Sequence, residues 1–282
     1  METLQLPGLL VSVEWLHQHL DHPELIILDA SIKKVTSAQA SLDNDVQIPG
    51  TRFFDIKKSF SDQNSYLPNM LPSAEDFEKN CKELGINANS KIVVYDTIGM
   101  YSSPRAWWMF SRMGHTNVAV LDGGFLEWNK KQLPTEIKGL TAIFDTGNFQ
   151  INDRSKCTVT AKEILFEMND PNTLILDARS SGRYKGIEPE PRSDLKGGHI
   201  PHSINLPYAT VLEEGKMLPK EKLQNIFDDL DIANKKLIFS CGSGITACII
   251  LLAAQLAGYT NLWIYDGSWT EWGQLTDVPI EF

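Results

Sequence analysis

The stretch Lys235-Lys-Leu-Ile-Phe-Ser-Cys-Gly-Ser-Gly-Ile-Thr-Ala-Cys248 joins an apolar strand pattern to an apolar helix pattern through a glycine-rich turn. Residues 237–240 read as a buried strand, and the run from 246 to 257 has the length and composition of a buried helix. Strands that alternate with helices are typical of α/β domains. We therefore predict an α/β fold in which Cys241 lies at the carboxyl end of one strand.

Cys241 lies where the local sequence favours a thiolate. Gly242 and Gly244 let the backbone curl so that several N–H groups point inward, and the start of the following helix adds its positive dipole end. A free thiol has a pKa of about 8.5, which such surroundings lower by about one unit or more. The competing interpretation is a small buried apolar residue, the usual state of a lone cysteine. The two glycines favour the nucleophile because they let a ligand approach the backbone.

The second half of the chain repeats the first at a nearly constant offset. The matching segments are 25–30 with 174–178, 48–49 with 200–201, 91–96 with 236–241, and 120–128 with 264–272. Within each copy, strands rich in Ile, Leu and Val alternate with helical patterns at residues 12–20, 74–84, 161–167 and 220–230. Two copies of one fold, each a mainly parallel central sheet flanked by helices, explain the repeat.

The repeat predicts two domains joined by a linker. The N-terminal domain spans residues 1–144, the linker with no clear periodicity spans 145–155, and the C-terminal domain spans 156–282. In the first copy Asp96 takes the place that Cys241 holds in the second. An aspartate cannot attack sulfur, and we expect it to be repelled by a turn built to hold anions. Only the C-terminal domain is therefore predicted to be catalytic, with the first as a structural or substrate-shaping partner.

The composition excludes several classes of protein. The chain has 282 residues, of which 42% are apolar and 22% charged, and its formal charge is -10. This acidic balance argues against nucleic acid and anionic membranes as partners. No apolar run predicts a signal peptide or a membrane span. Four tryptophans are predicted to fill the interface between helices and sheet rather than to bind a cofactor: Trp107, Trp108, Trp269 and Trp272.

The cysteines and histidines predict neither a disulfide framework nor a metal site. Cys81, Cys157, Cys241 and Cys248 are scattered and form no CxxC pair, which favours a reducing compartment and a cytoplasmic location. Cys248 is predicted to be a core residue, with a resolving or regulatory thiol as the alternative. His199 and His202 have no acid or cysteine at the usual ligand spacing.

Further motifs accompany the cysteine loop. They are Gly182–Arg192, Gly198–Pro201, Tyr265–Trp272, Met70–Pro72 and Ser103–Trp108. Together with the duplication and the loop itself, they resemble the two-domain rhodanese-type sulfurtransferases over almost the whole chain. Within these, the match is to the 3-mercaptopyruvate sulfurtransferases. The resemblance implies two tandem rhodanese-like domains.

The resemblance also implies a mechanism without a cofactor. The Cys241 thiolate attacks the sulfur of 3-mercaptopyruvate, pyruvate leaves, and a persulfide remains on Cys241. An acceptor thiol, such as thioredoxin or a low-molecular-weight thiol, or cyanide then takes the outer sulfur. Ser243 is the second catalytic residue, which assists proton movement or binds substrate. The implied substrate-binding residues are Arg183, Arg192, Gly242, Gly244, Ile245 and Thr246, whose backbone N–H groups in the loop stabilise thiolate and persulfide.

Arg183 and Arg192 match the two arginines of the family. A guanidinium grips a carboxylate at two points, which suits the carboxylate of mercaptopyruvate. The competing interpretation is that both arginines pair with the neighbouring carboxylates of Glu188, Glu190 or Asp194 as solvated charges.

The charge of the loop favours one sulfur donor. Thiosulfate is a dianion, and rhodaneses that use it tend to carry basic residues just after the cysteine, whereas residues 242–246 here are neutral. A phosphatase of this fold would need arginine at the sixth position after Cys241, where Ala247 stands. The alternatives that stay open are a thiosulfate:cyanide sulfurtransferase and a non-catalytic persulfide carrier.

One position departs from the family. Some members activate the loop serine through an aspartate and a histidine that lies just before Met-Leu-Pro. In this chain Asn69 precedes Met70, and the nearest acids, Asp55 and Asp62, match no clear counterpart. We therefore do not expect a histidine relay, and sulfur transfer does not require one if Cys241 is already anionic.

Overall fold

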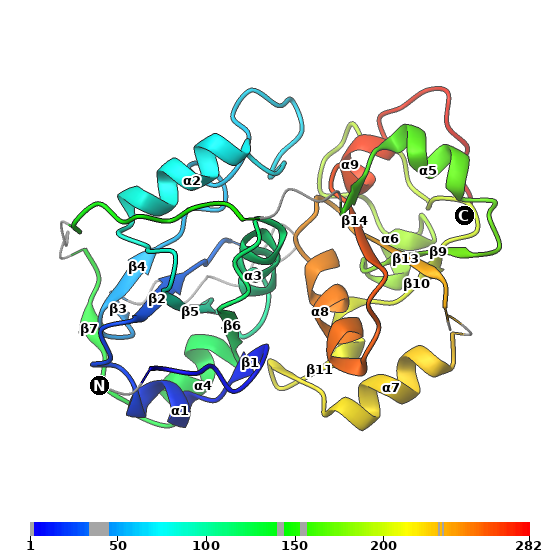
Figure 1. Ribbon diagram of the computed structural model, residues 1–282. Coiled ribbons are helices and arrows are strands. Elements are labelled where there is room, and N and C mark those ends of the chain that lie inside the picture. Colours follow the sequence, from blue (N-terminus) through cyan, green and yellow to red (C-terminus); the bar gives the residue numbers. More distant parts are fainter. Residues whose placement is uncertain (1–2, 34–44, 140–143, 153–156, 231, 233) are drawn as a thin grey trace. The chain divides into compact units, whose positions relative to one another are not determined.

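A computed structural model describes residues 3–33, 45–139, 144–152, 157–230, 232 and 234–282. The chain forms two compact units (Figure 1). The first unit comprises Met1–Gln63, Leu71–Ser155 and Glu214–Lys216, and the second comprises Asn64–Met70, Lys156–Glu213 and Met217–Phe282. Two short segments, 64–70 and 214–216, thus belong to the unit formed mainly by the other half of the chain.

The first unit contains a five-stranded sheet in the order β1-β6-β5-β2-β4, with every neighbouring pair parallel. Its strands are β1 Leu10–Val11, β2 Leu25–Asp29, β4 Thr51–Phe53, β5 Lys91–Tyr95 and β6 Val118–Leu121. A separate antiparallel pair joins β3 Val46–Gln47 to β7 Glu136–Ile137. The central strand β5 is buried along its whole length, as expected for a parallel strand with helices on both faces.

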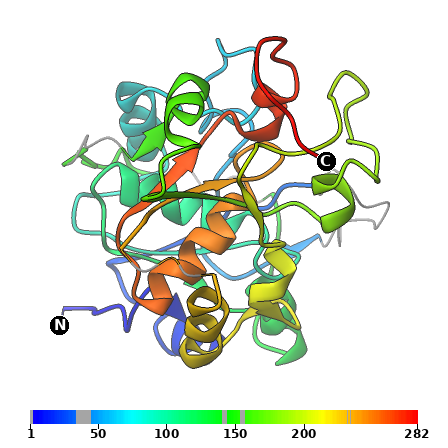
Figure 2. The ribbon, with the colours of Figure 1, turned by 90° about the vertical axis from the view of Figure 1, so that its right-hand side faces the viewer.

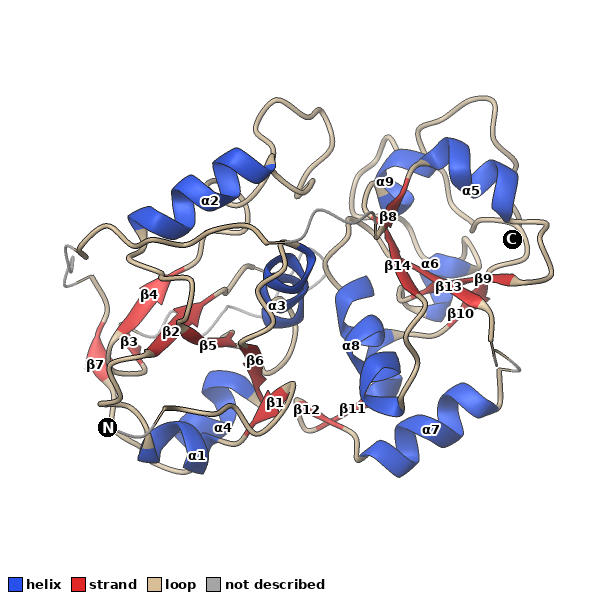
Figure 3. Ribbon diagram, viewed as in Figure 1, coloured by secondary structure: helices blue, strands red, loops and turns tan. Residues whose placement is uncertain are grey.

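Helices flank this sheet (Figure 3). They are α1 Val13–Gln18, α2 Ala74–Glu83, α3 Ser103–Arg112 and α4 Gly124–Lys130. Leu16 of α1 and Trp128 of α4 pack with Val93 of β5 in one core cluster. Phe77 of α2 and Phe110 of α3 form an aromatic cluster elsewhere in the unit, with ring centroids 5.2 Å apart. The helix predicted at 74–84 is confirmed by α2, which Ser73 caps by accepting from the Asp76 N–H.

The second unit repeats this topology. Its sheet has the order β10-β9-β13-β14-β8, again with parallel neighbours throughout. The strands are β8 Thr158–Val159, β9 Thr173–Asp177, β10 Ile204–Asn205, β13 Lys236–Ser240 and β14 Leu262–Tyr265. Two more strands, β11 Leu212–Glu213 and β12 Lys216–Met217, form a small two-stranded sheet. The same strand order in both units confirms the fold class that the internal repeat predicts.

The helices of the second unit are α5 Ala161–Glu167, α6 Ser181–Tyr184, α7 Lys220–Asp228, α8 Ala247–Ala257 and α9 Ser268–Trp272, with a 3-10 helix at Tyr208–Val211. Helix α8 is buried at nearly every position, as its uniformly apolar sequence predicts, and ends at Gly258 in the left-handed conformation. Figure 2 shows α8 (orange) lying against the strands of the sheet. Trp269 and Trp272 of α9 pack in the core cluster that also contains Ile238 of β13.

Residues 144–152 pack on the first unit. Phe149 is fully buried, and its N–H donates to the Ile86 carbonyl at 3.0 Å. The Gly147 N–H donates to the Lys82 carbonyl at 2.8 Å. This part of the predicted linker is therefore attached to the first unit, whereas residues 153–156 lie outside the described residues. The four predicted core tryptophans are all buried.

Within the described residues, none of the helices combines the length and hydropathy needed to cross a bilayer. The same part of the chain holds no cluster of three or more histidine, cysteine, aspartate or glutamate side chains suited to a metal ion. All four cysteines are free thiols.

Candidate active site

Cys241 directly follows β13 and is 1% exposed. Because β13 and β14 are parallel neighbours, their carboxyl ends meet at one edge of the sheet, and α9 begins just after β14. The Trp269 N–H donates to the Cys241 carbonyl at 2.9 Å, and the Thr270 N–H donates to the Gly242 carbonyl at 2.9 Å. The start of α9 therefore fixes the backbone of the cysteine loop.

The N–H groups of this loop are left open. Those of Gly242, Ser243, Ile245 and Thr246 donate to no acceptor within the described residues. Gly244 has a φ of 77°, the left-handed conformation that lets a short loop curl its N–H groups inward. The loop leads into α8, a helix of 11 residues whose first turn adds the positive dipole end. Residues 242–246 therefore have the features of an anion-binding loop, as predicted, and we call them the cradle.

The equivalent loop of the first unit is filled by its own side chain. Asp96 is fully buried, and its Oδ2 accepts from the N–H groups of Tyr101 at 2.8 Å, Ser102 at 2.9 Å and Ser103 at 2.9 Å. The Ser103 hydroxyl also donates to Oδ2 at 2.7 Å, and the Ile98 N–H donates to Oδ1 at 3.1 Å.

The expectation that Asp96 is repelled by such a turn is wrong. Inward-pointing N–H groups attract a carboxylate, and in the first unit they bind the carboxylate of the loop itself. The same position in the second unit carries a thiol and open donors. One copy of the loop is therefore closed by an internal anion and the other is open to an external one.

Arg183 lies beside the cradle and is also ion-paired. It belongs to the short helix α6, and its Nη2 is 2.5 Å from Glu190 Oε2 while its Nε donates to Glu190 Oε1 at 3.2 Å. The same Nη2 lies 3.0 Å from the point that a Cβ on Gly242 would occupy. The competing interpretation of a pair with Glu190 is thus correct for this arginine, but the pair is not solvated, because the Arg183 side chain is 15% exposed.

Arg192 reaches the same glycine through a threonine. Its Nη1 donates to Thr270 Oγ1 at 2.5 Å, and Thr270 Oγ1 donates to the Gly242 carbonyl at 2.6 Å. Within the described residues no carboxylate pairs with Arg192. The structure therefore brings both predicted arginines to the cradle at Gly242. Sequence analysis missed Thr270, although it lies in the quoted 265–272 motif.

Ser243 contacts the residue that replaces the histidine of some family members. Asn69 Nδ2 donates to Ser243 Oγ at 3.1 Å and to its carbonyl at 3.3 Å. Asn69 itself has a φ of 59°. Because Ser243 Oγ accepts this bond, its own proton is left for another acceptor. An amide neither gains nor loses a proton near neutral pH, so the pair cannot act as the relay that a histidine would provide.

Ser268 is a site residue that sequence analysis missed. It is fully buried, and its φ of 51° is unfavourable for a residue with a Cβ. Its Oγ accepts from the Cys241 N–H at 3.2 Å, lies 4.0 Å from Cys241 Sγ, and donates to the Tyr265 carbonyl at 2.8 Å. A strained residue in contact with the candidate nucleophile indicates a functional constraint.

The internal repeat contained a signal for Ser268. The match of 120–128 with 264–272 aligns Ser268 with Gly124, whose φ is 54°. A Cβ at Gly124 would collide with the carbonyl oxygens of Gly99 and Asp96. The second unit therefore carries a hydroxyl at a position where the first unit tolerates only glycine.

Cys248 is a core residue that contacts the cradle. Cys248 is fully buried, with its Sγ 3.4 Å from the Gly244 carbonyl, as expected for a core residue.

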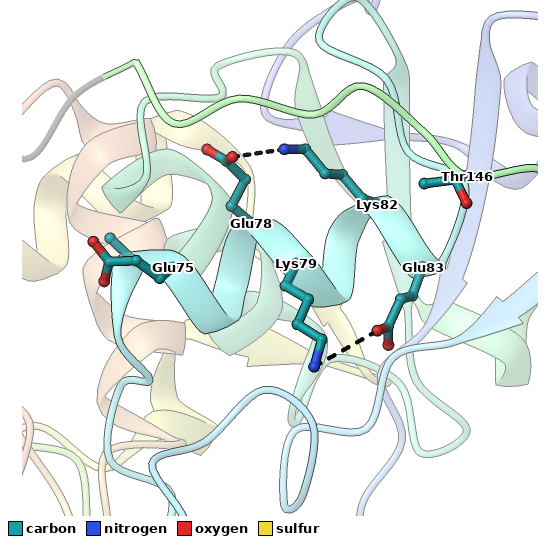
Figure 4. Close-up of a pocket in the computed structure, with 7 residues that line it drawn as sticks. Glu75, Glu78, Lys79, Lys82, Glu83 and Thr146 are labelled. Atoms are coloured by element: carbon teal, nitrogen blue, oxygen red, sulfur yellow. Dashed lines mark hydrogen bonds and ion pairs between the residues drawn. The ribbon is translucent and has the colours of Figure 1, made fainter.

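A hollow on the first unit runs along α2 (Figure 4) and is lined mainly by charged side chains. These pair with one another, Lys82 with Glu78 at 2.7 Å and Lys79 with Glu83 at 3.9 Å, so the hollow offers a ligand few free charges.

Comparison with known proteins explains the repeat and the loop. The model of the rhodanese-like domain matches residues 12–131 and again residues 160–275. The chain belongs to the rhodanese-like family. Its two matched ranges are the two halves of the internal duplication, and Cys241 lies in the second.

Relatives of this rhodanese-like chain are named as sulfurtransferases. It is 35% identical to 3-mercaptopyruvate sulfurtransferase of Escherichia coli K12, over 96% of this chain and 97% of that protein. It is 37% identical to the mitochondrial thiosulfate/3-mercaptopyruvate sulfurtransferase 1 of Arabidopsis thaliana, over 96% of this chain and 77% of that protein. The crystal structure of SseA, the E. coli 3-mercaptopyruvate enzyme, superposes with a TM-score of 0.82 and 33% identity, covering 93% and 99% of the two chains.

The closed loop of the first unit predicts a stabilising role for Asp96. We expect Asp96→Asn to lower the free energy of unfolding by about 1 to 3 kcal/mol. The NH2 group of asparagine would replace one carboxylate oxygen, so that a buried N–H which now donates to that oxygen would face another donor. Urea denaturation measures the change. Asp55→Asn is the control, since that carboxylate accepts two N–H groups in an exposed loop and should matter less. Equal stability of Asp96→Asn and wild type would contradict the assignment.

The hydrogen bond from the Cys241 N–H to Ser268 predicts a role for Ser268 in the reactivity of Cys241. We expect Ser268→Ala to slow alkylation of Cys241 by iodoacetamide at pH 7 about fivefold, because the backbone N–H of Cys241 loses its acceptor and the cysteine is no longer held in place. Ser268→Gly removes the same hydroxyl and also relieves the unfavourable φ, so it should react as slowly without loss of stability. Mass spectrometry of peptides gives the rate at each cysteine, with the half-buried Cys157 as internal control. Wild-type rates in both variants would assign Ser268 to packing alone.

Proposed function

We propose that this chain is a sulfurtransferase that takes the sulfur of 3-mercaptopyruvate onto Cys241 as a persulfide, releases pyruvate, and passes the sulfur to a thiol or to cyanide. The observation that carries the proposal is the open cradle behind a buried cysteine, in a chain whose other copy of the loop binds a carboxylate. The names of the relatives support the same donor. Cys241 and Ser243 are the proposed catalytic residues.

The first step is attack of the Cys241 thiolate on the donor sulfur. The new S–S bond forms as the C–S bond of mercaptopyruvate breaks, and the electron pair of that bond passes to the carbon chain as the enolate of pyruvate. A proton on this enolate completes pyruvate. The Ser243 hydroxyl, which accepts from Asn69, directs its proton to the carbonyl oxygen where negative charge develops.

The cradle acts on sulfur at each stage. Its open N–H groups stabilise the thiolate before attack and the persulfide after it, because charge on sulfur is favoured by fixed donors that need no reorganisation. Arg183, which lies beside Gly242, and Arg192, which reaches Gly242 through Thr270, bind the donor carboxylate. A Cβ at position 242 would lie 3.0 Å from Arg183 Nη2 and would crowd this guanidinium.

The proposal assigns the N-terminal domain, residues 1–144, a non-catalytic role, because Asp96 both replaces the nucleophile and fills the loop. The C-terminal domain, residues 156–282, would carry the reaction. The acceptor would be a reduced thiol, such as thioredoxin or a low-molecular-weight thiol, or cyanide. Four free cysteines and a persulfide intermediate suit a reducing cytoplasm, and the charge of -10 argues against nucleic acid or anionic membrane as a partner.

Intact mass tests the proposal directly. After exposure to mercaptopyruvate, the wild type should gain one sulfur that peptide mapping locates at Cys241. Cys241→Ser should gain none and lose turnover, because a hydroxyl at neutral pH is a far weaker nucleophile than a thiolate. Cys248→Ser is the control and should still gain sulfur, since Cys248 is fully buried. Turnover retained in Cys241→Ser, or sulfur on another side chain, would refute the mechanism.

A second candidate donor is thiosulfate, since the Arabidopsis relative is named for both donors. The neutral cradle favours mercaptopyruvate, so we expect its kcat/KM to exceed that of thiosulfate by about tenfold or more. Steady-state kinetics with cyanide as the common acceptor measures both. A higher value for thiosulfate would reverse the assignment of donor. Persulfide formation without turnover on either donor would instead indicate a persulfide carrier.

A further inference from the structure

A buried network of ion pairs lies behind Arg183 in the second unit. Asp177, the last residue of β9, pairs with Arg179 at 2.7 Å, Arg179 pairs with Glu190 at 2.9 Å, and Glu190 pairs with Arg183 at 2.5 Å. The side chains of Asp177, Arg179 and Glu190 are 3%, 0% and 1% exposed. Glu190 is therefore a buried carboxylate shared by two guanidinium groups.

The first arginine of the network is fully engaged inside the unit. Arg179 Nε and Nη2 donate to Asp177, and Nη2 also donates to the Gly198 carbonyl at 2.9 Å. Its guanidinium lies 4.2 Å from the ring centroid of Trp269. The backbone N–H of Trp269 donates to the Cys241 carbonyl. Each of the three guanidinium nitrogens of Arg179 thus donates inside the unit, and this buried arginine fixes Glu190 relative to the cradle.

Arg183 keeps one part of its guanidinium for a ligand. Glu190 uses its Nε and Nη2. Nη1 donates to no acceptor within the described residues, and it lies 3.8 Å from the point that a Cβ on Gly242 would occupy. Arg183 can therefore donate hydrogen bonds at the cradle while its charge is already compensated by Glu190.

The two arginines beside the cradle, Arg183 and Arg192, differ in whether a carboxylate neutralises their charge. Asp177 and Glu190 balance Arg179 and Arg183 in number and in contact. Arg192 contacts the neutral hydroxyl of Thr270 and pairs with no carboxylate in the described part of the chain. The cluster therefore presents one uncompensated positive charge to a ligand.

We propose that Glu190 determines the charge of the sulfur donor, selecting a monoanion with a single carboxylate over a dianion. This inference rests on the proposed function, and it assigns donor selection to a residue outside the cysteine loop. A monoanion is balanced by Arg192. A dianion would bring a second negative charge, and Arg183 cannot balance it because buried Glu190 already neutralises that guanidinium. Repulsion between charges at such a buried site is weakly screened. Glu190 acts through Arg183 and is thus a positioning residue that also sets specificity.

The decisive variant is Glu190→Gln, which keeps the shape of the side chain and removes its charge. We expect the ratio of kcat/KM for mercaptopyruvate to that for thiosulfate to fall at least about tenfold, because the cluster gains one uncompensated positive charge. Glu188→Gln is the matched control. Glu188 lies in the same segment, is exposed and accepts from the Ser180 hydroxyl, so its loss should leave the ratio unchanged. An unchanged ratio in Glu190→Gln would overturn the proposal.

A binding measurement keeps the proposal testable if that variant does not fold or if the wild type turns over neither donor. Methanesulfonate and sulfate are similar in shape and differ by one charge. Each is titrated for its protection of Cys241 against iodoacetamide at constant ionic strength. We expect the wild type to bind methanesulfonate at least as tightly as sulfate, and Glu190→Gln, if it folds, to prefer sulfate. Tighter binding of sulfate by the wild type would overturn the proposal whatever its sulfur donor is.

Discussion

The carbonyl groups of the cysteine loop accept hydrogen bonds within the unit, whereas the N–H groups of Gly242, Ser243, Ile245 and Thr246 donate to no acceptor in the described part of the chain, and this asymmetry underlies the proposed anion site. The carbonyls of Cys241 and Gly242 accept from the first residues of α9, and the Gly244 carbonyl contacts the Cys248 thiol. Because the C=O and N–H groups of a trans peptide point in opposite directions, fixing these carbonyl groups directs the N–H groups to the opposite face of the loop. The packing of α9 in the core, through Trp269 and Trp272, therefore fixes the loop in which we propose that the reaction takes place.

The two copies of the fold show this loop in two electrostatic states. Both sheets have the same strand order, and both loops follow the central strand that pairs with β2 or β9. In the first copy a carboxylate of the chain satisfies the donors, which adds stability and leaves no vacancy. In the second copy four of the loop donors have no acceptor in the described part of the chain, and under the proposed function a charged sulfur or a substrate would satisfy them. Duplication has thus separated folding from function within one chain.

The local pattern of the sequence was sufficient for the longer buried strands, for α8 and for the place of Cys241 directly after β13, because apolar runs and glycine positions act over a few residues. Residue contacts made across the sheet edge were not predictable in the same way. Ser268 and Thr270 reach the loop only because β14 lies beside β13. Asp96 was misjudged because its partners are backbone N–H groups, which no residue type reveals.

Asn69 has a consequence for how acidity governs this site. Its amide keeps the same protons over the whole range in which an imidazole would gain or lose one, so the hydrogen bond to Ser243 is present in acid and in base alike. The serine hydroxyl therefore never changes its orientation for lack of a protonated neighbour. The Asn69–Ser243 pair lacks a partner that can take up and release a proton. Its hydrogen bond would therefore keep its geometry at pH values that change the protonation of a histidine in the same position.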